Sequence, residues 1–283
     1  MQSSGRGTPR PYESHSIRAL QKGADFSFFM LQFQSLRAIP GLHHAVTTRN
    51  GGVSSGEYAS LNLAFHVGDE AELVRENRRI LARELGFDIR KLVTAQQVHG
   101  TKIGFPTWRE AGRGALDYES AHPAKDALIV AEKEIPVLIL VADCAPILLV
   151  DPENQVLAVV HAGWRGALAG IARKTVEHLK FDFGTRPENI VAGIGPCLSI
   201  ENLEVGEEVA AQVAQVDGKS VVSGWEKPHL DLRGLIQRDL ASAGVRAENI
   251  ETLPFCSKDD ARFFSHRGQK GVAGRFGIVA WWE

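Results

Sequence analysis

Cysteine is scarce in this sequence, which has three among its 283 residues: Cys144, Cys197 and Cys256. So small and odd a number cannot form the disulfide framework of a small secreted domain. It is typical of a protein kept in a reducing compartment, and we therefore predict a cytoplasmic location. A chain of this length can bury about 75% of its unfolded surface without such cross-links.

The sequence also lacks an excess of charge and a long apolar run. Lysine and arginine together number 32 and aspartate and glutamate 34, so the formal net charge is −2. Without a basic excess to attract a phosphate backbone, we predict no nucleic-acid partner. The longest apolar stretch, residues 135–150, is interrupted by Asp143 and Pro146. It is also shorter than the roughly 18 residues of a membrane-spanning helix, so we expect no membrane partner.

Residues 1–29 show no regular apolar pattern, which begins only after Met30. They lack the apolar segment of a secretory signal, and Glu13 and Asp25 argue against a transit peptide. We therefore predict a disordered leader over residues 1–29 and a single catalytic domain over residues 30–283.

Residues 30–283 contain a succession of apolar patterns with the periods of helices and strands. The turn Asp-Pro-Glu-Asn at residues 151–154 predicts a hairpin. Strands and helices alternate without a strict βαβ rhythm, which favours an α+β fold: a single domain of layered mixed β-sheets with helices packed outside. The irregular segment 104–125 is either a surface insertion or a mobile lid. The predicted helices cover residues 70–85, 166–179, 204–216 and 231–242, and the predicted strands cover residues 91–99, 126–131, 137–150, 155–161, 189–195, 251–255 and 275–282.

Three reactive side chains stand out in the apolar runs. His99 and His161 each end a run, and Cys144 lies inside one; each is close to a glycine or a proline. Two histidines and one cysteine are the ligand set of a catalytic zinc site that keeps one position open for water. Zinc would lower the pKa of that water to about 7. The same residues could instead be a cysteine nucleophile with a histidine base, or a buried thiol beside two histidines that bond to the backbone. Their spacing in the sequence leaves these alternatives open.

A second feature follows His161, where Gly163-Trp-Arg-Gly166 leads into a predicted helix. Free N–H groups at a helix N-terminus attract anions, and Arg165 would add a bidentate donor. The alternative is a tight turn between a strand and a helix, in which Trp164 covers the core.

These segments and several others resemble the YfiH-like family, which has been catalogued as a multicopper polyphenol oxidase or laccase domain and as a peptidoglycan editing factor. The similarity covers roughly residues 40–280, and the ordered series of motifs is far more specific than any one of them. The matching segments are Thr48-Arg-Asn-Gly-Gly-Val-Ser-Ser-Gly, Ser60-Leu-Asn-Leu, His66-Val-Gly-Asp, Glu76-Asn-Arg, Gln97-Val-His-Gly, Asp126-Ala-Leu, Ala142-Asp-Cys-Ala-Pro-Ile-Leu-Leu-Val-Asp, His161-Ala-Gly-Trp-Arg-Gly, Gly193-Ile-Gly-Pro-Cys, Phe264-Ser-His-Arg and Gly274-Arg.

The resemblance implies an α+β fold related to bacterial toxin deamidases, with a zinc ion bound by His99, Cys144 and His161. It implies a purine nucleoside phosphorylase, which would convert adenosine, inosine and methylthioadenosine with phosphate into the free base and ribose 1-phosphate. It also implies adenosine deaminase activity. Purine nucleosides and phosphate are therefore the expected small-molecule partners.

Phosphorolysis needs a pocket for an anion, and four residues are candidates for contacts with the substrates. Arg49 lies beside a glycine-rich turn, and Arg165 and Arg267 lie in two further matching motifs. Asn62 could bond the base or the sugar. Each of the four could instead have a structural role. For deamination the sequence offers no obvious general acid, because no histidine is followed two residues later by glutamate.

The laccase name does not fit the residues. Multicopper oxidases bind copper largely through His-x-His pairs, and none of the 10 histidines here forms one. Copper could still replace zinc at a nitrogen and sulfur site, so a copper-loaded polyphenol oxidase is an alternative function. Another is a cysteine-dependent amidase that edits peptidoglycan precursors through Cys144. A third is a metal-stabilised protein that only binds a partner.

The sequence departs from the family pattern at two places. His266 stands where the family often has tyrosine, and residues 198–202 replace a longer family segment that contains glycine and tyrosine. Both departures bear on substrate preference rather than on the metal.

Overall fold

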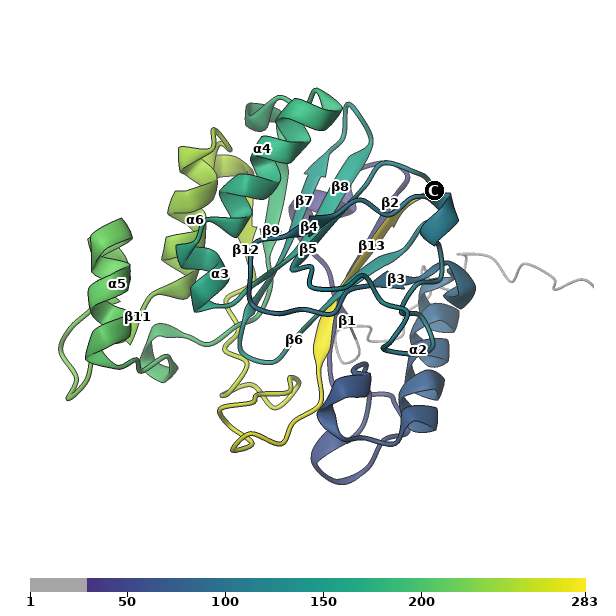
Figure 1. The fold of residues 1–283 in the computed structure, drawn as a ribbon, viewed down its shortest axis with the longest axis horizontal. Helices are drawn as coiled ribbons and strands as arrows, with labels where there is room; N and C mark the ends of the chain where they lie inside the picture. The colour runs from purple at the N-terminus through teal and green to yellow at the C-terminus, as the bar shows by residue number, and fades with distance from the viewer. Residues whose placement is uncertain (1–29) are drawn as a thin grey trace, which may run out of the picture.

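A computed structural model describes residues 30–283, which form two β-sheets packed face to face between layers of helices (Figure 1). The predicted leader, residues 1–29, lies outside the described residues. In spatial order, the first sheet contains β1 (Met30–Leu31), β2 (Leu42–Thr47), β13 (Phe276–Trp282), β6 (Val137–Val141) and β3 (Val93–Thr94). The second contains β12 (Ile250–Thr252), β9 (Val191–Ile194), β7 (Ala145–Asp151), β8 (Val156–Ala162), β5 (Ala127–Val130) and β4 (Ile103–Gly104).

Both sheets bury both of their faces, because successive side chains of a strand point to opposite sides. In β5, Leu128 and Val130 pack toward the first sheet, whereas Ala127 and Ile129 pack toward helices. The side chains of β6 alternate in the same way between the second sheet and α2. This double burial explains why these strands are continuously apolar in sequence.

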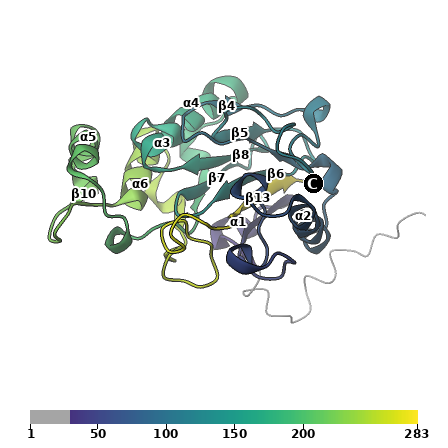
Figure 2. The same ribbon diagram turned by 60° about the horizontal axis from the view of Figure 1, so that its bottom comes forward.

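Helices cover the outer face of each sheet, which gives four layers (Figure 2). Beside α6, a short sheet of β10 (Val221–Val222) and β11 (His229–Leu230) packs against the projecting α5. The helices are α1 (Gln34–Arg37), α2 (Ala71–Leu85) on the first sheet, α3 (Trp164–Leu168), α4 (Ile171–Phe183) and α6 (Leu232–Ser242) on the second, and α5 (Glu207–Asp217).

This architecture confirms the predicted α+β fold with helices outside mixed sheets. The predicted hairpin is also confirmed, because β7 and β8 pair antiparallel on either side of residues 152–155. Segment 104–125 packs against α2, where Nη1 of Arg78 donates a hydrogen bond to the carbonyl of Ala115 at 3.0 Å. Within residues 30–283, no helix combines the length and the apolar character needed to cross a bilayer. The cytoplasmic location stays a prediction.

Three predicted elements are divided or shortened, and two of these changes lie beside Cys144 and His99. The predicted strand 137–150 was wrong as one element: it is divided into β6 and β7, which belong to different sheets. The chain turns between them at Asp143, whose φ of 89° lies in the left-handed region that favours glycine. The predicted helix 166–179 is divided into α3 and α4 at Gly170, where φ is 75°. The predicted strand 91–99 is reduced to β3.

His44 makes the stability of this fold sensitive to mild acid. Its ring, on β2, is 2% exposed and accepts a hydrogen bond from the N–H of Phe33 at 3.0 Å. Burial lowers the pKa of His44 from 6.5 to about 4, so below pH 6.5 the unfolded chain binds a proton that the folded chain does not. The free energy of unfolding should therefore fall as the pH drops from 6.5 toward 4.

We expect His44→Gln to reduce this acid sensitivity. The variant should be less stable than the wild type at pH 7, and the gap should shrink by about 2 kcal/mol at pH 5. Urea unfolding of both proteins at the two pH values measures the gap. An equal gap at pH 5 and pH 7 would contradict the assignment.

Candidate metal centre

The three predicted ligands come from separate elements and meet in space. Cys144 immediately precedes β7, His161 is the second-last residue of the neighbouring β8, and His99 lies in the loop after β3. Their ligand atoms all lie within 4.8 Å of one another. Nε2 of His99 is 3.7 Å from Sγ of Cys144, and the two imidazole rings meet edge to face with their centroids 4.7 Å apart.

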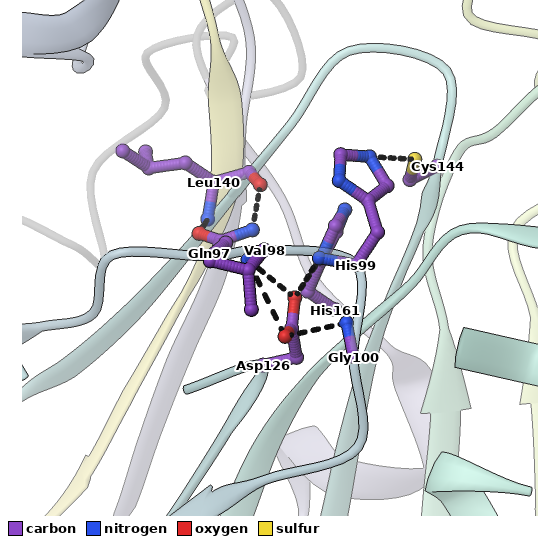
Figure 3. A network of polar contacts seen from close by, with 8 residues as sticks. All are labelled: Gln97, Val98, His99, Gly100, Asp126, Leu140, Cys144 and His161. Atoms are coloured by element: carbon purple, nitrogen blue, oxygen red, sulfur yellow. Dashed lines mark hydrogen bonds and ion pairs between the residues drawn. The ribbon is translucent and has the colours of Figure 1, made fainter. Parts of the chain in front are cut away.

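A buried carboxylate, Asp126, positions both histidines (Figure 3). It lies immediately before β5 and has no exposed surface. Its oxygens accept hydrogen bonds from the backbone N–H groups of residues 98–100, including that of His99 at 2.9 Å. A φ of 59° at His99 turns these successive N–H groups toward a single acceptor.

The same carboxylate fixes the orientation of His161. Nδ1 of His161 donates to Asp126 at 2.9 Å, because an ionised carboxylate can only accept. This bond leaves Nε2 of His161 free to face Cys144, as in metal sites where a carboxylate orients a histidine ligand. Burial opposes the charge of Asp126, but the bonds from His161 and the backbone lower its pKa, so the carboxylate stays ionised.

The charges of the cluster are coupled. Burial on its own would raise the pKa of the Cys144 thiol, but the charge of His161 and hydrogen bonds from both histidines lower it from 9.0 to about 6. Burial also opposes the charged form of His161, but Cys144 and Asp126 raise its pKa from 6.5 to about 9. Without a metal, Cys144 and His161 therefore form a thiolate–imidazolium pair at neutral pH.

The donor set and its spacing fit a tetrahedral zinc site. Zinc–sulfur and zinc–nitrogen bonds of about 2.3 and 2.0 Å place two such ligands about 3.5 Å apart. The distance of 3.7 Å between His99 and Cys144 is close to this value. Three protein ligands would leave a fourth position for water or substrate. The cluster can thus hold a metal ion, and its chemistry does not by itself distinguish zinc from copper.

Gly163, the residue before α3, allows the close approach of two ligands. A Cβ atom at this position would lie 2.9 Å from Cδ2 of His99 and 3.0 Å from Sγ of Cys144. The φ of −76° at Gly163 is open to any residue, so what requires glycine here is space. The helix start predicted as an anion site is the short α3, and it lies directly against the cluster.

The cluster lines a pocket of about 300 Å³, a volume at the lower end of the range for small-molecule sites. Trp164 and several leucines form an apolar part of its wall, and His66, Arg267 and Arg275 form a polar part. His161 is buried at 3% exposure, whereas His99 and Cys144 are accessible. A ligand in the pocket can therefore reach the cluster. No residue of segment 104–125 lines the pocket, which gives no support to the lid interpretation.

Of the four predicted substrate contacts, the structure places Arg267 in the pocket wall and the other three elsewhere. Arg49 lies over the ring of Phe264 and donates through Nε to a backbone carbonyl at 2.7 Å. Asn62 is fully buried and bonds to Asp69 and nearby backbone groups. The guanidinium of Arg165 lies over the ring of Trp164 at 4.3 Å. A substrate contact by these three residues stays a prediction, and their positions add nothing to it.

Sequence reasoning gave no role to three residues that shape the site: Asp126, Asp143 and Arg275. Asp126 and Arg275 each stand immediately before an apolar strand, and a charged residue at the start of a buried strand is the signal that could have drawn attention to them. Asp143 Oδ1 accepts hydrogen bonds from two serine hydroxyls, and Oδ2 accepts from the N–H of Arg267 at 2.6 Å. It thereby ties the turn that carries Cys144 to the segment that carries Arg267.

Comparison with known proteins places this site in context. A sequence model of the family described as multi-copper polyphenol oxidoreductase laccase matches residues 43–283. A protein of Deinococcus radiodurans named purine nucleoside phosphorylase is 39% identical over 237 residues, which cover 83% of this chain and 87% of that protein. A protein of Bacteroides thetaiotaomicron with the same name is 34% identical over 254 residues, or 88% of this chain and 92% of that protein.

Solved structures agree with these sequence matches. The hypothetical protein YfiH of Bacillus licheniformis superposes with a TM-score of 0.86 at 29% identity, over 90% of this chain and 97% of that one. YlmD of Geobacillus stearothermophilus superposes with a TM-score of 0.85 at 32% identity, over 90% of this chain and 96% of that one. The four-layered fold is therefore shared along nearly the whole of both proteins.

We expect Gly163→Ala to weaken zinc binding without unfolding the protein. The new Cβ would push His99 and Cys144 apart, and overpacking of this kind costs about 1–3 kcal/mol, or about 5- to 150-fold in affinity. Competition with a chromophoric chelator measures the zinc affinity. Gly218→Ala is the matched control, because φ at Gly218 is −59° and no atom lies within 4 Å of its added Cβ. Equal zinc affinity in the two variants would contradict the geometry.

We expect Asp126→Asn to lower zinc affinity by about 10- to 100-fold, because the carboxamide cannot accept all the hydrogen bonds that orient the two histidines. Asp151→Asn is the control. Asp151 is also a fully buried carboxylate that accepts several hydrogen bonds, but it is the last residue of β7, at the start of the turn to β8. Both variants should melt at a lower temperature, and only Asp126→Asn should lose zinc in the chelator titration. A similar loss of zinc in both would show that general destabilisation is the cause.

Proposed function

This chain belongs to the YfiH-like family described as multi-copper polyphenol oxidoreductase laccase, and from that premise we propose that it is a zinc-dependent purine nucleoside phosphorylase. Its relatives in D. radiodurans and B. thetaiotaomicron carry the name purine nucleoside phosphorylase. The observation that carries the proposal is the His99, Cys144 and His161 cluster in a pocket that also presents an aromatic ring and arginines. The proposed substrates are adenosine, inosine and methylthioadenosine.

Phosphorolysis exchanges one bond at the ribose for another. An oxygen of hydrogen phosphate bonds to C1′ as the bond from C1′ to the purine breaks. The purine leaves with the electron pair of that bond and takes up the proton that hydrogen phosphate gives up, so atoms and charge balance. The pocket wall supports such a reaction, because Trp164 can stack on a purine and Arg267 can bind an anion.

The residues of the cluster have distinct proposed roles. His99, Cys144 and His161 would hold the zinc ion, which when bound supplies a Lewis acid for a substrate oxygen or for water. Asp126 keeps Nδ1 of His161 protonated and both histidines in place. The apolar part of the wall removes water from the base.

Adenosine deamination is proposed as a second activity of the same pocket. It replaces the amino group of the base with oxygen from water and releases ammonia, so a group must carry a proton between them. His66 and His266 both line the pocket and are the candidates for this transfer.

One observation favours a second candidate function. The lowered pKa of Cys144, at about 6, is what a cysteine nucleophile needs, and His161 is next to it. In a cysteine-dependent amidase, the thiolate would attack a carbonyl carbon and the imidazolium would protonate the leaving amine. The copper-loaded oxidase has no comparable support, because the described residues form one His/Cys/His cluster and no set of paired histidines.

Product analysis tests the proposed function. With inosine, we expect hypoxanthine and ribose 1-phosphate only when phosphate is present, and with adenosine some inosine even without it. Zinc removal by a chelator should abolish both reactions, and zinc should restore them at neutral pH. Hypoxanthine without ribose 1-phosphate would mean hydrolysis and would rule out a phosphorylase. Restoration by copper alone, with oxidation of a phenol, would favour the oxidase.

The substitution Cys144→Ser separates the zinc enzyme from the amidase. A neutral hydroxyl replaces thiolate poorly as a ligand, so the variant should lose zinc and nucleoside activity together. If Cys144 is a nucleophile instead, turnover should be lost while the metal content stays the same. Full phosphorolysis by a metal-free Cys144→Ser protein would refute the zinc mechanism.

A further inference from the structure

The guanidinium of Arg275, the residue before β13, faces the pocket with hydrogen-bond donors left over. Its Nη1 donates to the carbonyls of Ala273 and Gly274 at 2.7 and 3.0 Å. Within residues 30–283, its Nε and Nη2 donate no hydrogen bond and it forms no ion pair with a carboxylate. Arg275 is half-buried, so its positive charge is partly removed from water, and no carboxylate forms an ion pair with it within the described residues.

A carboxylate lies near Arg275 but is committed to other donors. Asp143 lines the same pocket, and it is close enough, with Cys144, to raise the pKa that burial of Arg275 lowers. Both oxygens of Asp143 already accept hydrogen bonds, from Ser257, Ser265 and the backbone of Arg267. Asp143 therefore leaves the free edge of the Arg275 guanidinium to a ligand.

Several other arginines of the fold are committed to protein partners. Arg78 donates to backbone carbonyls through both Nε and Nη1 and is fully buried. Arg262 forms a two-pronged pair with Asp260, and Arg238 bonds to Asp217. Arg267 also lines the pocket, but its two terminal nitrogens each reach a backbone carbonyl, at 3.4 and 3.3 Å. Of these two arginines of the pocket wall, Arg275 is the one whose Nε and Nη2 both donate no hydrogen bond within the described residues, so one edge of its fork is open to a ligand.

His66 lies beside Arg275 in the pocket wall. Loss of water around the ring, together with the charges of Arg275 and Arg78, lowers the pKa of His66 from 6.5 to about 4. The ring is therefore neutral at physiological pH and presents one N–H donor and one acceptor nitrogen. A hydrogen phosphate ion, which has acceptor oxygens and one O–H donor, is complementary to such a ring next to a guanidinium.

We propose that Arg275, with His66 beside it, forms the subsite that binds inorganic phosphate in this pocket. The proposal rests on the phosphorylase function above and names the residues that hold its second substrate. Two parallel N–H donors of a guanidinium match two phosphate oxygens, which gives both affinity and orientation. The subsite lies near Cys144, so phosphate held there is close to a nucleoside that reaches the cluster.

The test measures phosphate and inosine dependence of phosphorolysis separately. For Arg275→Gln, we expect the KM for phosphate to rise about 10- to 100-fold, as expected for the loss of charge-assisted hydrogen bonds, with the KM for inosine within about twofold of the wild type. Arg275→Lys keeps the charge and loses the fork, so its KM for phosphate should rise less. Arg186→Gln is the control, since Arg186 is exposed and pairs with Glu188 outside the pocket.

A second measurement does not depend on turnover. Inorganic phosphate should raise the melting temperature of the wild type and of Arg186→Gln, and should leave that of Arg275→Gln unchanged. If the melting temperature and zinc content of Arg275→Gln without phosphate fall well below those of Arg275→Lys, and the two KM values rise together, Arg275 has a structural role and the proposal is wrong.

The remaining outcomes separate the subsite from the function. Phosphorolysis with the same KM for phosphate in the wild type and Arg275→Gln would overturn the subsite and leave the function intact. If the wild type forms no ribose 1-phosphate, the proposed function fails, and the melting experiment decides the subsite alone. A phosphate-induced rise that disappears in Arg275→Gln would then support an anion site, and equal or absent rises in both proteins would overturn it.

Discussion

The candidate site depends on a single buried charge, the carboxylate of Asp126. An ionised carboxylate away from water is strongly unfavourable unless its oxygens are satisfied. Here, backbone N–H groups of the loop after β3 and the ring of His161 on β8 satisfy them together. Because unpaired oxygens would destabilise the fold, these hydrogen bonds hold the loop after β3 against β8. The geometry of two ligands is therefore fixed by the same interaction that makes burial of Asp126 tolerable.

The third ligand depends on a different constraint, the way the chain passes between the two sheets. β6 ends in the first sheet and β7 begins in the second, and only Ala142, Asp143 and Cys144 join them. So short a crossover requires a sharp turn, which explains the left-handed φ of Asp143 and the hydrogen bonds that hold its carboxylate. Cys144 is thereby placed at the C-terminal end of β8, beside His161. The site lies where it does because the sandwich has this connection.

Local pattern predicted the arrangement of helices outside mixed sheets and singled out three reactive residues that meet in space, because both depend on short stretches of sequence. Their role as zinc ligands came from the family resemblance and stays a prediction. A strand buried on both faces is continuously apolar. Reactive residues such as His99, Cys144 and His161 are therefore conspicuous where they interrupt or end such a run. The breaks at Asp143 and Gly170 escaped prediction, since they depend on packing of whole sheets and helices. Likewise, Asp126 meets its partners only across 26 to 35 residues of chain. Arg49 was predicted as a substrate contact because it lies beside a glycine-rich turn. In the fold its side chain lies over the ring of Phe264 and donates a hydrogen bond to a backbone carbonyl.

The zinc enzyme and the cysteine amidase would use the same side chains. They differ in whether a metal ion or a proton lies between Cys144 and His161. In the metal-free cluster, the pKa values of about 6 for Cys144 and about 9 for His161 mean that the thiolate is already formed and that His161 holds a proton. A metal ion must displace that proton to bind His161. Between these two pKa values, metal affinity therefore rises with pH, by about tenfold per unit for one displaced proton. Within this range, a lower pH favours the ion pair of a nucleophilic cysteine, and a higher pH favours the metal site. The proton on Nε2 of His161, which the charges of Cys144 and Asp126 stabilise, sets the balance between the two.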